Sequence, residues 1–231
     1  GDRAGFVNER GEFLSADLAL LVVAKDVLSR HPGKKIVYDV KSSQLLELLI
    51  PQYGGIPLMH RTGHAPIKET LRKDGSVVLG GEVSGHFYFV EDYFKIDDGL
   101  FAAAKMLELF AKHKGSFSSL FEGIPFRVRT PEIKLGCVDE KKFDVVEKIV
   151  ASLQAKFRSI LIDGIRIQVT EHGWGLIRAS NTSPYLTIRV EGETEEEALK
   201  IKNILADELE KFPEVQETLD RKEVLSFTGR L

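Results

Sequence analysis

The sequence predicts two domains in tandem, an α/β domain with a doubly wound, mostly parallel sheet and then an α+β domain. Two patterns predict this arrangement. Short apolar runs alternate with helical patterns in the first half, whereas strands of alternating apolar and polar residues cluster in the second. The chain has 231 residues, of which 43% are hydrophobic, and this is enough to bury a core in each domain.

The first half begins with a Ser start signal and an Ala-, Leu- and Val-rich segment, which predicts a buried helix at 15–30. Short apolar, β-rich runs predict strands at 36–40, 56–59, 77–79 and 87–90. Helical patterns predict helices at 44–52, 66–72 and 97–113. Because helices separate most of these strands, we expect a mostly parallel sheet, and we place this α/β domain at residues 12–122.

The second half shows strands that alternate apolar and polar residues, as half-buried antiparallel strands do. Strands are expected at 126–130, 160–162, 166–170, 174–178 and 185–190. Asp139 is expected to cap a helix that carries Val146 and Ile149 on one face. Thr194 and Glu197 form a capping box at the start of a second helix. These features predict an α+β domain at residues 123–231, in which the tail after Pro213 has no assigned structure.

Composition limits the class of protein. The 32 Lys and Arg residues nearly balance the 35 Asp and Glu residues, which disfavours a dedicated nucleic-acid binder because such proteins need a basic surface. Cys137 is the only cysteine, so no intramolecular disulfide can form and a cytoplasmic location is expected. The longest apolar run, 18–24, is too short to cross a bilayer, so no membrane partner is expected. The chain opens on Gly1-Asp2-Arg3 without Met, which is typical of a cut through a larger protein.

Polar clusters follow three of the expected strands, at 39–41, 61–64 and 80–86. The carboxyl ends of parallel strands meet at one edge of a sheet, so we expect these clusters to open on the same edge. Their side chains suit a phosphosugar. Glu82 and Ser84 can hydrogen-bond to adjacent hydroxyls, whereas Lys41 supplies positive charge.

His64 and His86 add groups that exchange protons near neutral pH. Each residue of these clusters also has an ordinary interpretation: a histidine beside a glycine is often a turn residue, and Lys41 can be a solvated loop lysine. The shared edge of the sheet favours the binding-site interpretation for the three clusters together.

A fourth polar cluster, 178–184, joins two strands of the second domain. It offers a guanidinium, three hydroxyls and an amide within seven residues, and these groups can cradle an anion. Asn and Ser are also common in hairpin turns for reasons of backbone geometry alone. Composition leaves both interpretations open.

In order along the chain, these clusters resemble the α-D-phosphohexomutase superfamily, most closely the bacterial phosphomannomutase/phosphoglucomutase group. Gly-Glu-Val-Ser-Gly-His at 81–86 and Arg-Ala-Ser-Asn-Thr-Ser-Pro at 178–184 carry most of the resemblance. The family has four domains, and this chain resembles its carboxyl-terminal half. The resemblance implies that 1–11 end domain 2, that 12–122 form the Rossmann-like domain 3, and that 123–231 form domain 4, which resembles the TATA-binding-protein fold.

The resemblance implies an isomerase that interconverts hexose 1-phosphate and hexose 6-phosphate through a phosphoserine and a bisphosphorylated sugar. It implies one Mg²⁺ ligand here, Asp2, with the other ligands upstream of residue 1. The catalytic residues that it implies are Arg3, Lys41, His64 and His86. The substrate-binding residues that it implies are Thr62, Gly63, Glu82, Ser84, Arg178, Ser180, Asn181, Thr182 and Arg189. Because the phosphoserine belongs to the missing amino-terminal half, this chain alone is expected to be inactive and to need that half as a partner.

Other functions share some of these features. A non-catalytic phosphosugar-binding module would carry the same loops and would lack only the nucleophile. A phosphoglucosamine mutase would resemble the same superfamily, but those enzymes usually carry Gln where Val83 stands. An interaction or nucleic-acid module is disfavoured by the near-neutral charge. The choice between mannose and glucose phosphates stays open.

Overall fold

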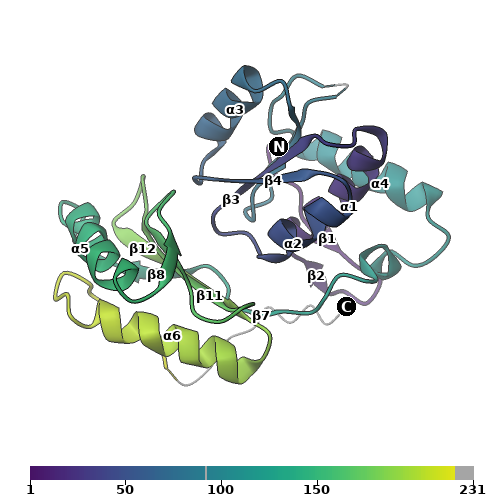
Figure 1. Cartoon of the computed structure of the whole chain (residues 1–231). Coiled ribbons are helices and arrows are strands. Elements are labelled where there is room, and N and C mark those ends of the chain that lie inside the picture. The colour runs from purple at the N-terminus through teal and green to yellow at the C-terminus, as the bar shows by residue number, and fades with distance from the viewer. Residues whose placement is uncertain (92, 222–231) are drawn as a thin grey trace. The chain divides into compact units, whose positions relative to one another are not determined.

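The computed structural model describes residues 1–91 and 93–221 (Figure 1). Contacts along the chain divide these residues into two compact units, which join between Pro125 and Phe126. Each unit is described by itself. Asp92 and residues 222–231, which form the end of the unassigned tail, lie outside the described residues.

The first unit is built on a sheet with the strand order β4-β3-β5-β6. The four strands are β3 (Lys35–Asp39), β4 (Ile56–His60), β5 (Val77–Gly81) and β6 (Phe87–Phe89). Strand β3 is parallel to both β4 and β5, whereas β6 is antiparallel to β5. The expected mostly parallel sheet is therefore confirmed. Its two inner strands, β3 and β5, are almost entirely buried because helices cover both faces.

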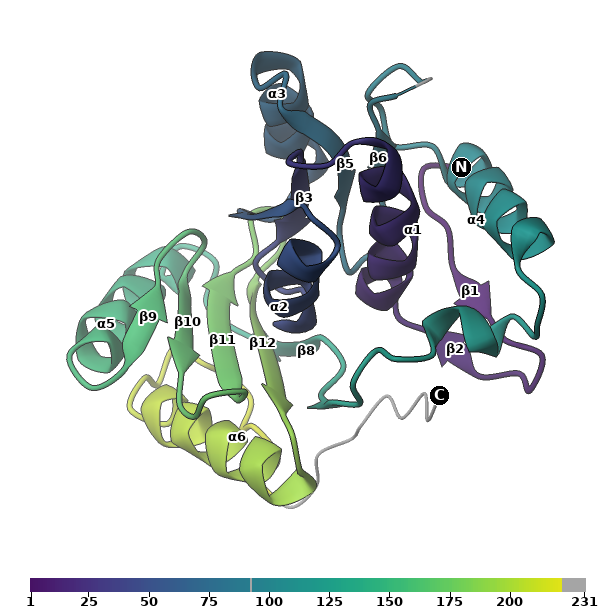
Figure 2. The ribbon, with the colours of Figure 1, turned by 45° about the vertical axis from the view of Figure 1, so that its right-hand side comes forward.

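Helices lie on both faces of this sheet (Figures 1 and 2). On one face, α1 (Ala16–Arg30), α2 (Leu45–Gln52) and α4 (Gly99–Lys112) share a core with alternate residues of the strands. On the other face, α3 (His64–Lys73) packs Ile67 and Leu71 against Val37 and Tyr88. Neighbouring residues of a strand point to opposite faces, so Tyr88 joins the α3 side while Phe87 and Phe89 join the α1 side.

A short hairpin precedes the sheet, and no periodic pattern in the sequence predicts it. Its strands, β1 (Phe6–Val7) and β2 (Phe13–Leu14), have two residues each. The ring of Phe6 meets the ring of Phe87 edge-on, with centroids 5.8 Å apart, and fixes the hairpin to the core. At the turn of the hairpin, Glu9 accepts hydrogen bonds from the backbone and side chain of Ser118, which opens the 3₁₀ helix η1 (Ser118–Phe121).

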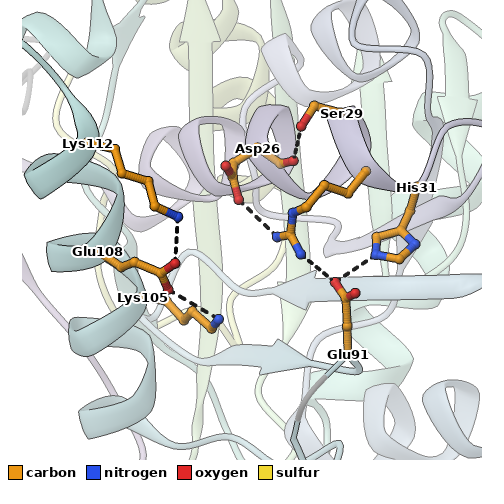
Figure 3. Close-up of polar contacts among 8 residues, drawn as sticks. Asp26, Ser29, His31, Glu91, Lys105, Glu108 and Lys112 are labelled. Atoms are coloured by element: carbon orange, nitrogen blue, oxygen red, sulfur yellow. Dashed lines mark hydrogen bonds and ion pairs between the residues drawn. The ribbon is translucent and has the colours of Figure 1, made fainter.

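Charged side chains link the end of α1 to the strand beside it (Figure 3). Arg30 contacts Asp26 one turn earlier at 3.0 Å and Glu91, just after β6, at 2.8 Å. Glu91 also contacts His31, at 2.7 Å. On α4, Glu108 contacts Lys105 and Lys112. These groups are all at least partly exposed, so each pair contributes little to stability.

The second unit has an antiparallel sheet with two helices on one face, as Figure 2 shows. Its strand order is β7-β12-β11-β10-β9, and β8 also pairs with β12. The strands are β7 (Val128–Arg129), β8 (Ile133–Gly136), β9 (Arg158–Ile160), β10 (Ile165–Gln168), β11 (Trp174–Ala179) and β12 (Tyr185–Gly192). The helices α5 (Lys142–Gln154) and α6 (Glu195–Leu209) share a core with one face of these strands. The α+β expectation is confirmed.

Several local predictions for this unit need correction. The strand expected at 126–130 has only two residues, and β8 had no prediction. Asp139 does not cap α5, because Lys141 holds the N-cap position and the Asp139 carboxylate accepts a hydrogen bond from Lys142 instead. The capping box is partly confirmed, since the Thr194 hydroxyl accepts from the backbone of Glu197.

The tail after Pro213 packs against the second unit as far as the structure describes it. The backbones of Val138 and Gln216 donate to the carbonyls of Glu214 and Gly136, respectively, so the tail runs alongside the end of β8. Leu219 is buried in the core of the unit. Among the described helices of both units, none has the length and apolar character needed to cross a bilayer.

Candidate functional site

Three loops of the first unit meet at the carboxyl edge of the parallel sheet. They are residues 40–44 after β3, 61–63 after β4 and 82–86 after β5. The backbone of Val83 donates to Asp39 Oδ1 at 3.3 Å, and the backbone of Gly63 donates to Glu82 Oε2 at 3.1 Å. The three clusters therefore share one edge. Gly80 and Gly81 belong to β5 itself and not to the loop that follows it.

Glu82 is the residue that joins two of these loops. The residue is only 3% exposed. One carboxylate oxygen, Oε2, accepts from Gly63, and the other, Oε1, accepts from the Tyr88 hydroxyl at 2.6 Å. Burial, followed by the charge of Glu82 and the hydrogen bond to it, raises the pKa of Tyr88 above its ordinary value, so Tyr88 stays a donor. A carboxylate held from two sides keeps its orientation toward the loop edge.

His86 lies between a cation and an anion. Arg3 Nε donates to His86 Nε2 at 3.1 Å, and His86 Nδ1 faces Asp97 Oδ2 at 3.0 Å. His86 Nε2 therefore accepts a hydrogen bond from Arg3, and the opposite ring nitrogen lies within ion-pairing distance of Asp97. His86 is buried, whereas His64, the first residue of α3, is exposed. Their ring centroids are 6.3 Å apart, so the two histidines are neighbours on this edge.

Asp97 is held by a cation of α3. Lys68 Nζ donates to Asp97 Oδ1 at 2.8 Å. Burial alone would raise the pKa of Asp97, but the hydrogen bond from Lys68 and the nearby positive charge outweigh it, so this pKa lies below its ordinary value. The structure thus places an ionised carboxylate behind His86.

The loop after β3 is organised by Asp39, which is fully buried. Its Oδ1 accepts from the hydroxyl of Ser42 at 2.6 Å, and its Oδ2 lies 3.7 Å from Lys41 Nζ. Lys41 is buried rather than solvated, which rules out the solvated-loop interpretation. In the loop after β5, Ser84 is half-buried and Gly85 has φ +95°. A Cβ at Gly85 would lie 2.8 Å from the carbonyl oxygen of Ala4, so glycine allows residues 1–4 to lie against this loop.

Asp2 lies close enough to His86 and Asp97 for the three to form a possible cation site. One ligand atom from each lies within 4.8 Å of the others. The set fits Mg²⁺ only in part, because Mg²⁺ prefers oxygen ligands in octahedral geometry and His86 offers nitrogen. Asp97 is already paired with Lys68, whereas the Asp2 carboxylate is 61% exposed and accessible. Asp2 is therefore the residue of this set best suited to a hard cation.

The fourth cluster lies in the second unit, around the loop between β11 and β12. Arg178 is near the end of β11, and residues 180–184 form the β11–β12 loop. Ser180 is buried, whereas Asn181 and Thr182 are exposed. The backbone of Thr182 donates to the Ser180 hydroxyl at 3.4 Å. The loop thus presents an amide and a hydroxyl beside the end of the strand that carries Arg178.

The partners of this loop come from two other elements. Arg178 Nε donates to Asp163 Oδ2, before β10, at 2.9 Å. Lys142 Nζ, at the start of α5, donates to the carbonyl of Ser183 at 3.0 Å. Arg189 lies on β12 opposite Leu176, two residues beyond the partner of Arg178. It is therefore on the same sheet face as Arg178, but farther from the loop.

Sequence reasoning missed the residues that hold the site together. Tyr88, Lys68, Asp163 and Lys142 were not singled out, and Asp97 was expected only as the first residue of a helix. The sequence around each of these residues contains no motif that marks a functional site, so only tertiary contacts identify them. The one sequence feature that could have pointed to two of them is the acidic character of Asp97 and Asp163 close to expected strands or helices.

Two family models match the chain. The model described as "Phosphoglucomutase/phosphomannomutase, alpha/beta/alpha domain III" matches residues 15–127, and the model described as the "C-terminal domain" of the same family matches residues 132–208. The chain belongs to the phosphoglucomutase/phosphomannomutase family. Within this family it corresponds to the third and fourth domains, as the loop motifs indicated.

Curated relatives and a solved structure agree with this assignment. The "Phosphomannomutase/phosphoglucomutase" of Pseudomonas syringae is 41% identical over 212 residues, which cover 91% of this chain and 45% of the relative. The "Phosphoglucomutase" of Neisseria gonorrhoeae is 37% identical and covers 92% of this chain and 46% of the relative. A Burkholderia thailandensis family protein aligns with a TM-score of 0.82 at 36% identity, over 91% of this chain and 44% of that one. The chain therefore spans less than half the length of these relatives.

Proposed function

We propose that this chain supplies the sugar-recognition and phosphate-binding half of a phosphohexomutase, which interconverts hexose 1-phosphate and hexose 6-phosphate. The observation that carries the proposal is the double anchoring of Glu82, whose carboxylate joins the loops after β4 and β5 at one edge of the sheet. A rigid, buried carboxylate at such an edge is suited to the hydroxyls of a sugar. Family membership supports the same conclusion.

In the first unit, Glu82 and Ser84 bind sugar hydroxyls, and Thr62 and Gly63 line the site beside them. Lys41 supplies positive charge toward the phosphate. His64 and His86 are the candidate groups for moving a proton to or from the reacting hydroxyl. His64 is exposed at the start of α3, and His86 is oriented by Asp97, so the two can serve different steps. Arg3 is directed at the same edge by its contact with His86.

In the second unit, Arg178, Ser180, Asn181 and Thr182 bind the phosphate that does not react, and Arg189 adds charge on the same sheet face. The reaction through a bisphosphorylated sugar requires the sugar to bind in two orientations. A loop that recognises a phosphate without reading the ring meets that requirement, because the phosphate is present in both orientations. Phosphoryl transfer depends mainly on such positioning and charge neutralisation.

The remaining groups that the reaction needs are assigned to the half of the relatives that this chain does not cover. Asp2 would be one ligand of Mg²⁺, and the other ligands and the phosphoserine would come from the preceding domains. When bound, the ion would neutralise charge on the transferring phosphoryl group. Residues 1–11 would then end domain 2, with 12–122 and 123–231 as domains 3 and 4. A cytoplasmic location suits an enzyme of soluble sugar phosphates.

An exposed apolar stripe on α4 supports the proposal that an amino-terminal half binds this chain. Leu100, Ala104, Leu107 and Ala111 follow helical spacing and are exposed, and Leu100 is 80% exposed. Exposed apolar stripes of this length are uncommon on the surface of isolated domains. The curated relatives contain an additional half that could cover the stripe, since this chain spans only about 45% of their length.

The test combines binding and turnover. Isothermal titration should show that the full chain binds glucose 1-phosphate and does not bind glucose. Adding glucose 1-phosphate and Mg²⁺ to the chain alone should give no glucose 6-phosphate, whereas co-expression with the amino-terminal half of the Pseudomonas syringae relative should restore turnover. Leu107→Asp should block that restoration, and Leu161→Asp, at another exposed apolar site, should not. Turnover by the chain alone would contradict the need for a second half, and binding without any restored turnover would favour a phosphosugar-binding module.

A further inference from the structure

We propose that Asp163 is a positioning residue for phosphate binding, which holds Arg178 by Nε so that the outer edge of the guanidinium faces the anion. The inference rests on the proposed function, because that function makes Arg178 a phosphate ligand. It adds to the phosphate site a residue from a different hairpin. The loop motif does not include this carboxylate, and its charge alone would not favour phosphate binding.

The contact between the two side chains is short and shielded. Arg178 Nε lies 2.9 Å from Asp163 Oδ2, and the side chains are 6% and 16% exposed. A guanidinium is a planar fork, in which the edge carrying the two terminal amino groups points away from a partner bound at Nε. That outer edge is the one that binds a phosphate in a bidentate manner. An arginine already held at Nε also loses less side-chain freedom when the phosphate binds.

The position of Asp163 is itself fixed by the hairpin that carries it. Gly164 has φ +72°, a conformation that favours glycine. A Cβ at Gly164 would lie 2.3 Å from the carbonyl oxygen of Ile177 and 2.8 Å from the Cα of Arg178. The turn between β9 and β10 therefore lies directly against the segment of β11 that holds Arg178. Ile165, the next residue, pairs with Ile177. The carboxylate is thus placed by backbone packing and does not depend on the β11–β12 loop.

If only its charge mattered, Asp163 would weaken phosphate binding instead of supporting it. A carboxylate next to a phosphate site repels the phosphate and lowers its affinity. Lys142 contributes a positive charge at the same loop and donates a hydrogen bond to the Ser183 carbonyl. Removal of Asp163 should therefore strengthen phosphate binding if only charge matters, and should weaken it if Asp163 orients Arg178. The two explanations predict changes of opposite sign.

The experiment measures dissociation constants for glucose 1-phosphate and for inorganic phosphate by isothermal titration with the full chain. Asp163→Ala should raise the dissociation constant by roughly 3- to 10-fold, which corresponds to the cost of ordering one long side chain. Asp163→Asn keeps an oxygen that can accept from Nε and should recover most of the affinity. In an Arg178→Ala background, Asp163→Ala should add no further loss.

Two more variants make the result decisive. Asp207→Ala removes an exposed carboxylate that pairs with Arg221 at 2.7 Å, so it controls for a lost Asp–Arg pair in the same unit and should leave the dissociation constant unchanged. Asp163→Glu keeps the charge but moves the carboxylate by one methylene, and it should weaken binding. This variant provides the test if Asp163→Ala does not fold, which Trp174 fluorescence would reveal.

The possible failures are distinguishable. If Arg178→Ala weakens binding while Asp163→Ala and Asp163→Glu bind as tightly as the parent chain or more tightly, the positioning role is wrong and the proposed function stands. If Arg178→Ala binds glucose 1-phosphate as tightly as the parent chain, the phosphate site itself is wrong.

Discussion

The Tyr88 hydroxyl donates to Glu82 Oε1 at 2.6 Å, and both residues are buried. Tyr88→Phe removes the donor and leaves a buried carboxylate oxygen without this partner. We expect the free energy of unfolding to fall by about 1–3 kcal/mol. Glucose 1-phosphate should also bind more weakly, because Glu82 would be held only by Gly63.

Urea unfolding and isothermal titration measure the two effects. Tyr53→Phe, which removes a hydroxyl from the half-buried tyrosine that follows α2, is the matched control and should change neither quantity by as much. A Tyr88→Phe protein with parental stability and affinity would show that the hydroxyl does not hold Glu82 in place.

Gly99 allows the first residues of the chain to lie against the start of α4. Its backbone donates to the carbonyl of Gly1 at 2.8 Å, and a Cβ at this position would lie 2.2 Å from the carbonyl oxygen of Arg3. Gly99→Ala should displace residues 1–4, weaken the contact of Arg3 with His86, and lower the free energy of unfolding by roughly 1–3 kcal/mol.

Limited proteolysis should then cleave the first residues faster in Gly99→Ala than in the parent chain. Gly75→Ala is the control, because a Cβ at Gly75 meets nothing within 4 Å. Equal cleavage rates in the two variants would contradict the packing of residues 1–4 against α4.

Glu9 makes the stability of the first unit depend on pH. The hydrogen bond from the Ser118 hydroxyl, together with backbone hydrogen bonds, lowers the pKa of Glu9 from 4.5 to about 2. Because the pKa is lower in the folded state, the contribution to stability is complete above pH 4.5 and is lost as the pH falls toward 2. Calorimetry should show that Glu9→Gln lowers the melting temperature more at pH 6 than at pH 3.

The exposed Glu47 of α2 provides the control for Glu9, since Glu47→Gln removes the same charge elsewhere in the unit. The same drop in melting temperature at pH 6 and pH 3 for Glu9→Gln would mean that ionised Glu9 does not hold the hairpin to η1.

The parts of the fold that could be predicted are those with sustained periodicity. The long apolar helix α1 and the buried strand β3 were expected within one or two residues of their observed bounds. Strands of two residues, such as β1 and β2, carry no period and could not be located from sequence. The expected Asp139 cap was wrong because Lys142, on the first turn of α5, binds that carboxylate instead.

The candidate site could also be predicted only in part, but for a different reason. Residues such as Glu82 and His64 could be selected because they lie after strands of a parallel sheet. Their partners could not, since the pairing of Arg3 with His86 joins positions 83 residues apart. Asp163 likewise reaches Arg178 through the packing of one hairpin against another strand. Such contacts depend on tertiary structure, which local patterns do not encode.

Gly164 should be among the least replaceable residues of the second unit. Gly164→Ala combines a strained positive φ of +72° with a contact of 2.3 Å to the Ile177 carbonyl. Backbone strain costs about 1–2 kcal/mol and the overlap about as much again, so we expect a loss of roughly 3 kcal/mol in the free energy of unfolding.

Trp174 is the only tryptophan and lies on β11, so its fluorescence reports unfolding of this unit. Gly33→Ala, with φ +77° and nothing within 4 Å of a Cβ, isolates the cost of backbone strain when its unfolding is followed by calorimetry. If Gly164→Ala lost no more stability than Gly33→Ala, the turn would not be pressed against the strand that carries Arg178.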